Sequence, residues 1–170
     1  MKVLISREKI QRKVEELGKK ISEHYADTPF TVLVILKGSF IFASDLVRNI
    51  SSNRLTVDFL RLSSYSGTES SGKIRAEDKR MDGFKNKHIL IIEDIVDTGL
   101  TISFLKKKME SSGAASVSLC SLLEKPDVNR GKVKIDFTGF SIPDEFVVGY
   151  GLDMDEKYRN EPDILIYSEK

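Results

Sequence analysis

The feature that most constrains the fold is a set of short, almost continuously apolar runs separated by helix-length segments. The runs are TVLVIL at 31–36, HILIIE at 88–93 and SVSLCSLL at 116–123. Such Val-, Ile- and Leu-rich runs are typical of strands buried on both faces, which occur in parallel sheets covered by helices. Amphipathic spacing predicts a first helix that follows Ser6, and helices are also predicted at 40–50 and 98–111. We therefore predict a single α/β domain over residues 1–170, with a central, mostly parallel sheet flanked by helices.

Three further segments are strand candidates, and one segment cannot contribute to a core. LTVDFLRL at 55–62 alternates apolar and polar residues, and short apolar stretches follow at 146–150 and 164–167. Residues 63–78, SSYSGTESSGKIRAED, contain two glycines and several Ser and Thr residues. That composition predicts a mobile loop or a loose hairpin.

The charge balance and the cysteine count argue against several classes of protein. The chain has 27 Lys and Arg residues against 26 Asp and Glu residues, a net charge of +1, which does not support a nucleic-acid-coating surface or a polybasic membrane anchor. Cys120 is the only cysteine, so no intrachain disulfide can form, and neither histidine has the spacing of a zinc ligand. Because no signal-peptide region or membrane-span window is recognisable, we expect a cytoplasmic protein with no nucleic-acid or membrane partner.

Polar residues cluster directly after three of the predicted strands. Lys37 and Gly38 follow the first, residues 93–101 follow the run that begins at His88, and Lys125 follows the last. In open α/β sheets, ligands bind in the crevice beyond the carboxyl ends of the strands. We therefore expect these clusters to converge on one mouth.

The segment 97–101, DTGLT, lies where a buried strand is predicted to turn into a helix. Free backbone N–H groups at a helix start attract anions, a glycine lets the backbone approach closely, and two threonine hydroxyls add donors. The two acids just upstream, Glu93 and Asp94, suit sugar hydroxyls or a hard cation. The pattern favours a site for a phosphorylated sugar. The alternative is a helix capped by Asp97 or Thr98 with solvated acids.

The sequence IEDIVDTGLT at 92–101 resembles the signature with which type I phosphoribosyltransferases bind phosphoribosyl pyrophosphate. The resemblance extends over most of the chain from residue 31 onward. LKG resembles the pyrophosphate loop, Ser64-Tyr65 the start of the mobile catalytic loop, and LLEK at 122–125, FVVGYGLD at 146–153 and Arg159 the purine-binding parts. It implies the type I phosphoribosyltransferase fold, with a small hood of N- and C-terminal segments over the base site.

The resemblance also implies a purine-salvage enzyme that joins hypoxanthine or guanine to phosphoribosyl pyrophosphate, giving IMP or GMP and pyrophosphate, with Mg²⁺ as cofactor. In the matching positions Asp97 is the general acid/base at purine N7. The 5′-phosphate is held by Asp97, Thr98, Gly99, Leu100 and Thr101. Leu100 stands where some members have Lys, which changes little if backbone amides supply the binding. Glu93 and Asp94 hold the ribose hydroxyls, and the metal ligands are Glu93, Asp94 and Asp153.

The remaining implied residues contact the base and the pyrophosphate. The base is bound by Lys125, Phe146, Val147 and Asp153, and the pyrophosphate by Lys37, Gly38, Ser64, Tyr65 and Arg159. A lysine ammonium only donates hydrogen bonds, so it suits the 6-oxo group of hypoxanthine, guanine or xanthine. The resemblance further implies a cis peptide bond between Leu36 and Lys37, a loop at 63–78 that closes over the substrates, and a homodimer or homotetramer.

Three alternatives remain open at this level. The first is an enzyme of the same fold that acts on another base, such as xanthine or a pyrimidine. The second is a regulator that keeps the fold to sense metabolites or bind nucleic acid. The balanced charge and the presence of Asp97 argue against the regulator. The third is a sugar-phosphate-binding α/β domain with different chemistry.

Overall fold

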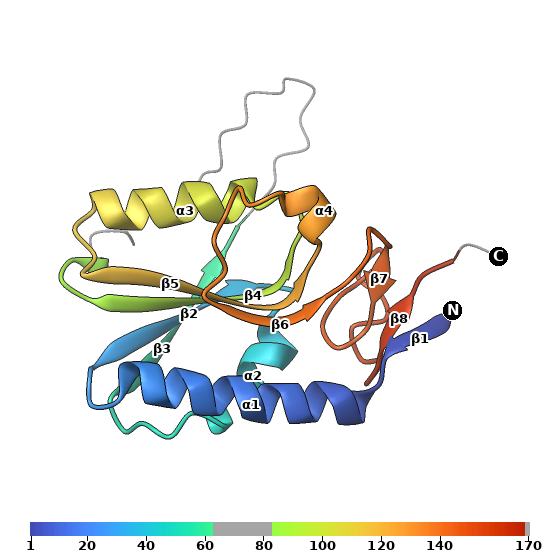
Figure 1. The fold of residues 1–170 in the computed structure, drawn as a ribbon, viewed down its shortest axis with the longest axis horizontal. Coiled ribbons are helices and arrows are strands. Elements are labelled where there is room, and N and C mark those ends of the chain that lie inside the picture. The colour runs from blue at the N-terminus through green and yellow to red at the C-terminus, as the bar shows by residue number, and fades with distance from the viewer. Residues whose placement is uncertain (63–82, 169–170) are drawn as a thin grey trace.

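The computed structural model describes residues 1–62 and 83–168, and its centre is a five-stranded sheet (Figure 1). The strands are β2 (Phe30–Leu36), β3 (Leu55–Arg61), β4 (His88–Val96), β5 (Ser116–Glu124) and β6 (Phe137–Ser141). Their order is β3-β2-β4-β5-β6, and every neighbouring pair runs parallel. The predicted α/β class, with a parallel sheet flanked by helices, is confirmed.

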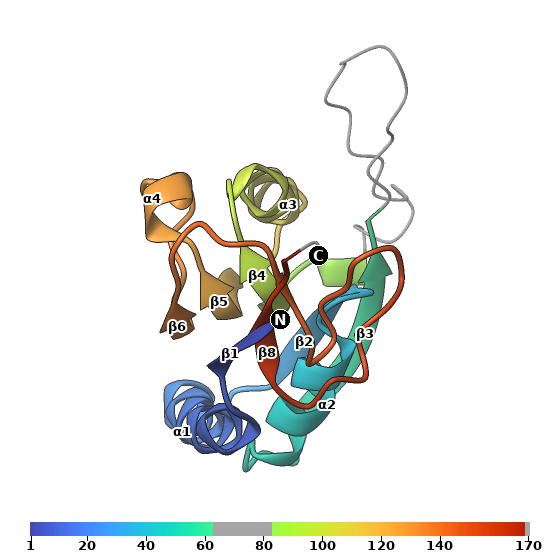
Figure 2. The same ribbon diagram turned by 90° about the vertical axis from the view of Figure 1, so that its right-hand side faces the viewer.

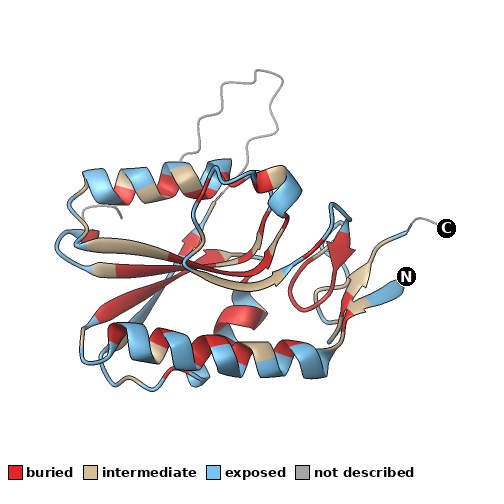
Figure 3. Cartoon of the chain, viewed as in Figure 1, coloured by how far each residue is buried: buried red, intermediate tan, exposed pale blue. Residues whose placement is uncertain are grey.

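Helices cover both faces of this sheet (Figure 1). On one face lie α1 (Arg7–Tyr25) and α2 (Phe40–Arg48), and on the other lie α3 (Leu100–Ser111) and the short α4 (Pro126–Asn129). In Figure 3 the buried positions of α1 and α3 lie on the sides that face the sheet. The apolar side of each of these two helices therefore packs against the sheet, as the amphipathic spacing of the sequence predicts.

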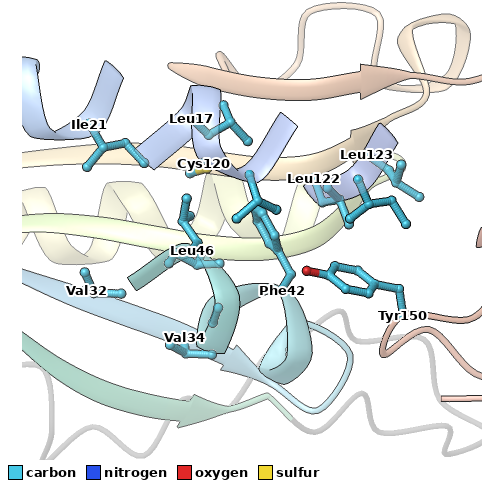
Figure 4. Close-up of a cluster of buried hydrophobic side chains, with 14 of the residues drawn as sticks. Leu17, Ile21, Val32, Val34, Phe42, Leu46, Cys120, Leu122, Leu123 and Tyr150 are labelled. Atoms are coloured by element: carbon cyan, nitrogen blue, oxygen red, sulfur yellow. The ribbon is translucent and has the colours of Figure 1, made fainter. Parts of the chain in front are cut away.

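Two hydrophobic clusters result because consecutive residues of a strand point to opposite faces. Val32 and Val34 of β2 pack with α1 and α2, whereas Leu33 and Ile35 pack with α3. Figure 4 shows the first cluster, in which Phe42 of α2 is fully buried. Burying a side chain of this size stabilises the fold by roughly 1.5–3 kcal/mol relative to leaving it exposed.

A second, smaller sheet lies beyond the carboxyl ends of the parallel strands (Figures 1 and 2). It consists of β1 (Lys2–Ile5), β8 (Ile164–Ile166) and β7 (Val147–Val148), antiparallel in the order β1-β8-β7. The N–H of Arg7 also donates to Asp163 Oδ1 at 2.7 Å, which ties the two ends of the chain together. This sheet is the hood, so the predicted combination of N- and C-terminal segments is confirmed.

Several boundaries differ from the prediction. Strand β4 continues to Val96 through parallel pairing with β5, beyond the predicted end at Glu93, so Asp94 lies within the strand rather than after it. Helix α3 begins at Leu100 with Gly99 as its N-cap, so the alternative of a cap at Asp97 or Thr98 is wrong. Three elements were not predicted, namely β1, β6 and α4. The predicted loop at 63–78, with Ser64 and Tyr65, lies outside the described residues.

No helix in the described part of the chain is long and apolar enough to cross a membrane.

Candidate active site

A cavity of about 300 Å³ opens at the carboxyl ends of β2 and β4. Five residues predicted for the sugar and its phosphate line this cavity, together with apolar residues from both strands. The five are Glu93, Asp97, Thr98, Gly99 and Thr101. The most specific motif of the sequence therefore does form one concave site.

The turn at 97–101, called the phosphate turn below, is shaped by Gly99. This residue has φ of +70°, a left-handed conformation that glycine adopts without a steric penalty. A Cβ added there would lie 2.6 Å from Val133 Cγ1 and 2.9 Å from Asn129 Oδ1. The turn is thus packed closely against the segment after α4, and its backbone leads directly into the first turn of α3.

Asn129 packs against Gly99 of the phosphate turn and was not identified as a site residue from the sequence. It is buried, and its side-chain amide donates to Glu124 Oε1 and to the Val133 carbonyl, each at 3.1 Å. Its Oδ1 in turn accepts from the Val133 N–H at 3.1 Å. A buried amide with this many partners fixes the backbone under Gly99.

Glu93 and Asp94, the acid pair, are ionisable groups in a poorly solvated position. Asp94 is buried, and its Oδ1 accepts from the Ile95 N–H at 2.9 Å, whereas Glu93 Oε2 is buried and has no hydrogen-bond partner. Burial, reinforced by the neighbouring Asp94, raises the pKa of Glu93 well above its ordinary value. Burial also raises the pKa of Asp94. An orphaned carboxylate oxygen at a cavity wall is ready to accept a hydroxyl or bind a cation.

The predicted pyrophosphate loop closely approaches Asp94 of the acid pair. The Leu36–Lys37 peptide bond is cis, which confirms the prediction. A Cβ added at Gly38 would lie only 1.7 Å from Asp94 Oδ2, so this glycine is what permits the approach. Gly151 meets the same loop from the other side, since a Cβ there would lie 2.1 Å from the Gly38 carbonyl oxygen.

Lys125 lies at the end of β5, where its backbone N–H donates to the Val96 carbonyl at 3.0 Å. The residue is 8% exposed, and Nζ forms an ion pair with Asp144 Oδ1 at 2.9 Å. An almost buried ammonium needs such a partner. Asp144 was not predicted, and its closeness in sequence to Phe146 is the only signal that could have suggested it.

Phe146 and Val147 lie at the edge of the hood. Phe146 is 52% exposed, and Tyr167 packs against it edge to face, with ring centroids 5.8 Å apart. Val147 is buried and begins β7. A large exposed ring supported by a second ring is a suitable stacking surface for a flat heterocycle.

The segment 149–161, the C-terminal loop, carries Asp153 and Arg159. Arg159 forms an ion pair with Asp153 at 2.8 Å and donates to the Gly151 carbonyl at 2.7 Å. Glu156, which was not predicted, contacts Arg159 at 3.1 Å and Lys37 at 2.7 Å. These hydrogen bonds, first with Lys37 and then with Arg159, lower the pKa of Glu156.

The three residues predicted as metal ligands do not form a ready-made cage. Within residues 1–62 and 83–168 no group of three or more His, Cys, Asp or Glu side chains is arranged to hold a metal ion. A magnesium site built from one or two carboxylates and substrate phosphates would need no such group, because Mg²⁺ commonly keeps several waters and binds with its substrate.

The phosphate turn, the acid pair and Lys125 lie at the carboxyl ends of the neighbouring strands β4 and β5, and Phe146 lies at the edge of the hood. The arrangement suits a molecule with a phosphate, a sugar and a flat base. Ser64 and Tyr65 cannot be placed relative to it, because they lie outside the described residues.

Comparison with known proteins points to one family. Residues 5–155 match the model of the phosphoribosyl transferase domain. The chain is 44% identical over 162 residues to the hypoxanthine-guanine phosphoribosyltransferase of Bacillus subtilis, covering 95% of this chain and 89% of that protein. It is 41% identical over 170 residues to the enzyme of the same name from Streptococcus pneumoniae, covering 99% and 94%.

A solved structure agrees with the sequence relatives. The hypoxanthine-guanine phosphoribosyltransferase of Bacillus anthracis superimposes with a TM-score of 0.88 at 39% identity, covering 99% of both chains. The family model covers most of the chain, and the relatives match nearly all of it. The strand-end motif, the parallel sheet and these relatives together show that the chain belongs to the phosphoribosyl transferase domain family.

Proposed function

We propose that this chain transfers the phosphoribosyl group of phosphoribosyl pyrophosphate to hypoxanthine or guanine. A bond forms between the purine and the ribose carbon C1′, the bond from C1′ to pyrophosphate breaks, and IMP or GMP is released with pyrophosphate. The observation that carries this proposal is one cavity lined by both the phosphate turn and Glu93. The names of the relatives support the choice of base.

In this reaction the phosphate turn holds the 5′-phosphate through backbone N–H groups at the start of α3. Glu93 and Asp94 accept hydrogen bonds from the ribose hydroxyls. As positive charge develops on the ribose ring, these nearby carboxylates favour it electrostatically. Their burial strengthens the effect, because charges interact more strongly where water is excluded.

Asp97 is the first residue of the phosphate turn; it is exposed and lines the cavity. We assign it the proton transfer at purine N7, a role worth about 10²–10⁴-fold in rate.

Lys125 donates to the 6-oxo group of the base and would oppose the 6-amino group of adenine. A buried donor left without an acceptor is costly, and this cost gives the specificity. Phe146 stacks on the purine, and Val147 lies at the edge that carries the 2-substituent.

Magnesium fits the residues present, since Glu93 Oε2 is a buried, unpartnered carboxylate oxygen and Asp94 lies beside it. When bound, Mg²⁺ supplies Lewis-acid neutralisation of the departing pyrophosphate. Glu93, Asp94 and Asp153 would hold it, with substrate oxygens completing the coordination. Lys37, Gly38 and Arg159 contact the pyrophosphate, and Ser64 and Tyr65 are proposed to join them.

We also propose that the chain assembles as a homodimer or homotetramer through the edge of its sheet. Among the described residues, Val57 of β3 is 43% exposed and Phe40 of α2 is 44% exposed. Large exposed apolar side chains are typical of surfaces that are covered by a partner. Light scattering should give twice or four times the chain mass, and Val57→Ser should lower it; a monomeric wild type would contradict the assembly.

The function is tested by mixing the protein with phosphoribosyl pyrophosphate, magnesium and one base at a time, then measuring nucleotide. Hypoxanthine and guanine should be converted to nucleotide, and adenine should not. The rate with xanthine shows where this base ranks relative to hypoxanthine and guanine. A reaction without any base provides the background. Absence of nucleotide with every base, from a folded protein, would overturn the proposal.

A further inference from the structure

One acidic side chain joins the two cations that are proposed to bind pyrophosphate. Glu156 Oε1 lies 2.7 Å from Lys37 Nζ, and Glu156 Oε2 lies 3.1 Å from a terminal nitrogen of Arg159. Each carboxylate oxygen thus accepts from a different cation. Lys37 and Arg159 are 122 positions apart in sequence (159 − 37), so the bridge exists only because the fold brings two loops together.

The Arg159 and Glu156 side chains differ in how firmly they are held. Arg159 is 18% exposed and is also fixed by Asp153 and by the Gly151 carbonyl. The Glu156 side chain is 63% exposed, although its backbone N–H is fixed by donation to Asp153 Oδ2 at 2.9 Å. The carboxylate can therefore rotate outward without a change in the backbone and with little desolvation cost.

A carboxylate and a phosphate compete for the same donors, because both are anions that accept charge-assisted hydrogen bonds from Lys and Arg. As long as Glu156 bridges the cations, its negative charge repels any phosphate that approaches them. Pyrophosphate carries more charge and more acceptor oxygens than one carboxylate, so it can replace the bridge.

We propose that Glu156 is a built-in competitor of pyrophosphate, which bridges Lys37 and Arg159 in the free protein and leaves when pyrophosphate binds. This inference rests on the proposed function, since it assumes that these cations form the pyrophosphate site. The bridge weakens binding of phosphoribosyl pyrophosphate and returns when the product pyrophosphate departs. Glu156 thereby sets the affinity of the site without taking part in the chemistry.

The test measures binding of inorganic pyrophosphate, in the presence of magnesium, to the wild-type chain and to Glu156→Gln by calorimetry. Loss of two exposed ion pairs and one repulsive charge should make pyrophosphate bind about two- to tenfold more tightly. A gain of affinity cannot arise from misfolding. If Glu156 instead positions the cations for the ligand, the same variant binds pyrophosphate more weakly, and the proposal is overturned.

Two control variants separate the bridge from net charge. Asp155→Asn makes the same change of charge at the neighbouring exposed residue and should leave pyrophosphate affinity within twofold of wild type. Glu156→Asp keeps the charge but is one methylene too short to reach both cations, so it should also bind more tightly, though less than Glu156→Gln. An equal gain from Asp155→Asn would reduce the effect to general electrostatics and overturn the proposal.

The two proposals fail in different ways. If the wild type binds pyrophosphate but forms no nucleotide from any base, the proposed function fails and the competitor role can still be read from the calorimetry. If nucleotide forms and Glu156→Gln leaves both pyrophosphate affinity and the KM for phosphoribosyl pyrophosphate unchanged, the competitor role fails alone.

Discussion

The two ends of the candidate site are built in different ways. The sugar-phosphate end comes from one continuous segment, residues 93–101, whose strand β4 is mostly buried between two helical layers. The base-and-pyrophosphate end comes from three separate segments around Lys37, Lys125 and residues 144–159, and ion pairs whose carboxylates are exposed link them. The first end depends on the core, and the second depends on charge.

This difference teaches where specificity can change without damage to the fold. In the proposed reaction phosphate and ribose are common to every nucleotide product, and the residues proposed to bind them are fixed by backbone geometry and burial. The base differs among substrates, and it meets side chains whose supports, such as Asp144 at 65% exposure, are solvated. Substitutions at the two ends should therefore separate stability from specificity.

The largest effect is expected at Asp97, which lies on the rigid end but acts by its chemistry. Asp97→Asn removes the proton-transfer group and should lower kcat about 10²–10⁴-fold, while binding of IMP stays close to wild type. Steady-state kinetics and calorimetry measure the two quantities. Asp27→Asn, at an exposed position outside the site, is the control and should behave as wild type. Unchanged base-dependent pyrophosphate release in Asp97→Asn would remove Asp97 from the mechanism.

Two phenylalanines test the comparison directly. Phe42→Ala leaves a cavity in the core and should lower the free energy of unfolding by about 3–5 kcal/mol, measured by denaturant titration. Phe146→Ala, at the exposed hood, should leave stability within about 0.5 kcal/mol and raise the KM for the base. Comparable stability losses in both variants would erase the distinction between the two ends.

Lys125 tests specificity at the base end. Lys125→Met removes the ammonium and keeps much of the side-chain volume. A hydrogen bond to a charged group is worth about 1.5–3 kcal/mol, so kcat/KM for hypoxanthine should fall about 10–10²-fold. Rates with adenine should fall less or rise, because its amino group no longer faces a donor. An equal loss with every base would assign Lys125 a structural role only.

The smallest effect is a pH dependence at the acid pair. Because burial raises the pKa of Glu93, the folded protein keeps a proton that the unfolded chain has lost above the ordinary pKa of 4.5. The free energy of unfolding therefore falls as the pH rises from the ordinary pKa of 4.5 toward the raised pKa of Glu93. Glu93→Gln removes the titration, so in EDTA its stability relative to wild type should increase as pH rises above 4.5 and the difference should vanish below it.

The exposed Glu16 gives the opposite sign and serves as the control. Hydrogen bonds with Lys13 and then Lys20 lower the pKa of Glu16 to about 2. Its contribution to stability is present above pH 4.5 and is lost as pH falls toward 2. Glu16→Gln should thus cost a little stability at neutral pH and nothing in strong acid. The same sign for both variants would contradict the assignment of Glu93 as a buried, destabilised carboxylate.

Much of the fold and the sugar-phosphate end could be predicted because their signals are local. Buried strands such as β2 and the phosphate turn are contiguous in sequence, and their residue types reflect their own environment. Strand β1 could not be predicted, since its four residues are a strand only through pairing with β8 at the other end of the chain. Short β6 is an edge strand of half-buried residues and gives little periodicity.

The supporting side chains of the site were missed for a similar reason. Asn129, Asp144 and Glu156 are polar residues in or near short turns, where composition alone indicates solvated positions. Their roles depend on partners such as Gly99, Lys125 and Lys37, which only the tertiary structure brings near. Roles that require a ligand stay predictions, as for Ser64 and Tyr65.

The central claim is that the phosphate turn grips the 5′-phosphate so that the acid pair meets the ribose and Phe146 meets the base. A crystal structure of the protein with IMP tests it most directly. We predict the phosphate against the backbone N–H groups of residues 98–101, the ribose hydroxyls at Glu93 and Asp94, and the purine between Lys125 and Phe146. A nucleotide bound with its phosphate away from this turn would contradict the account.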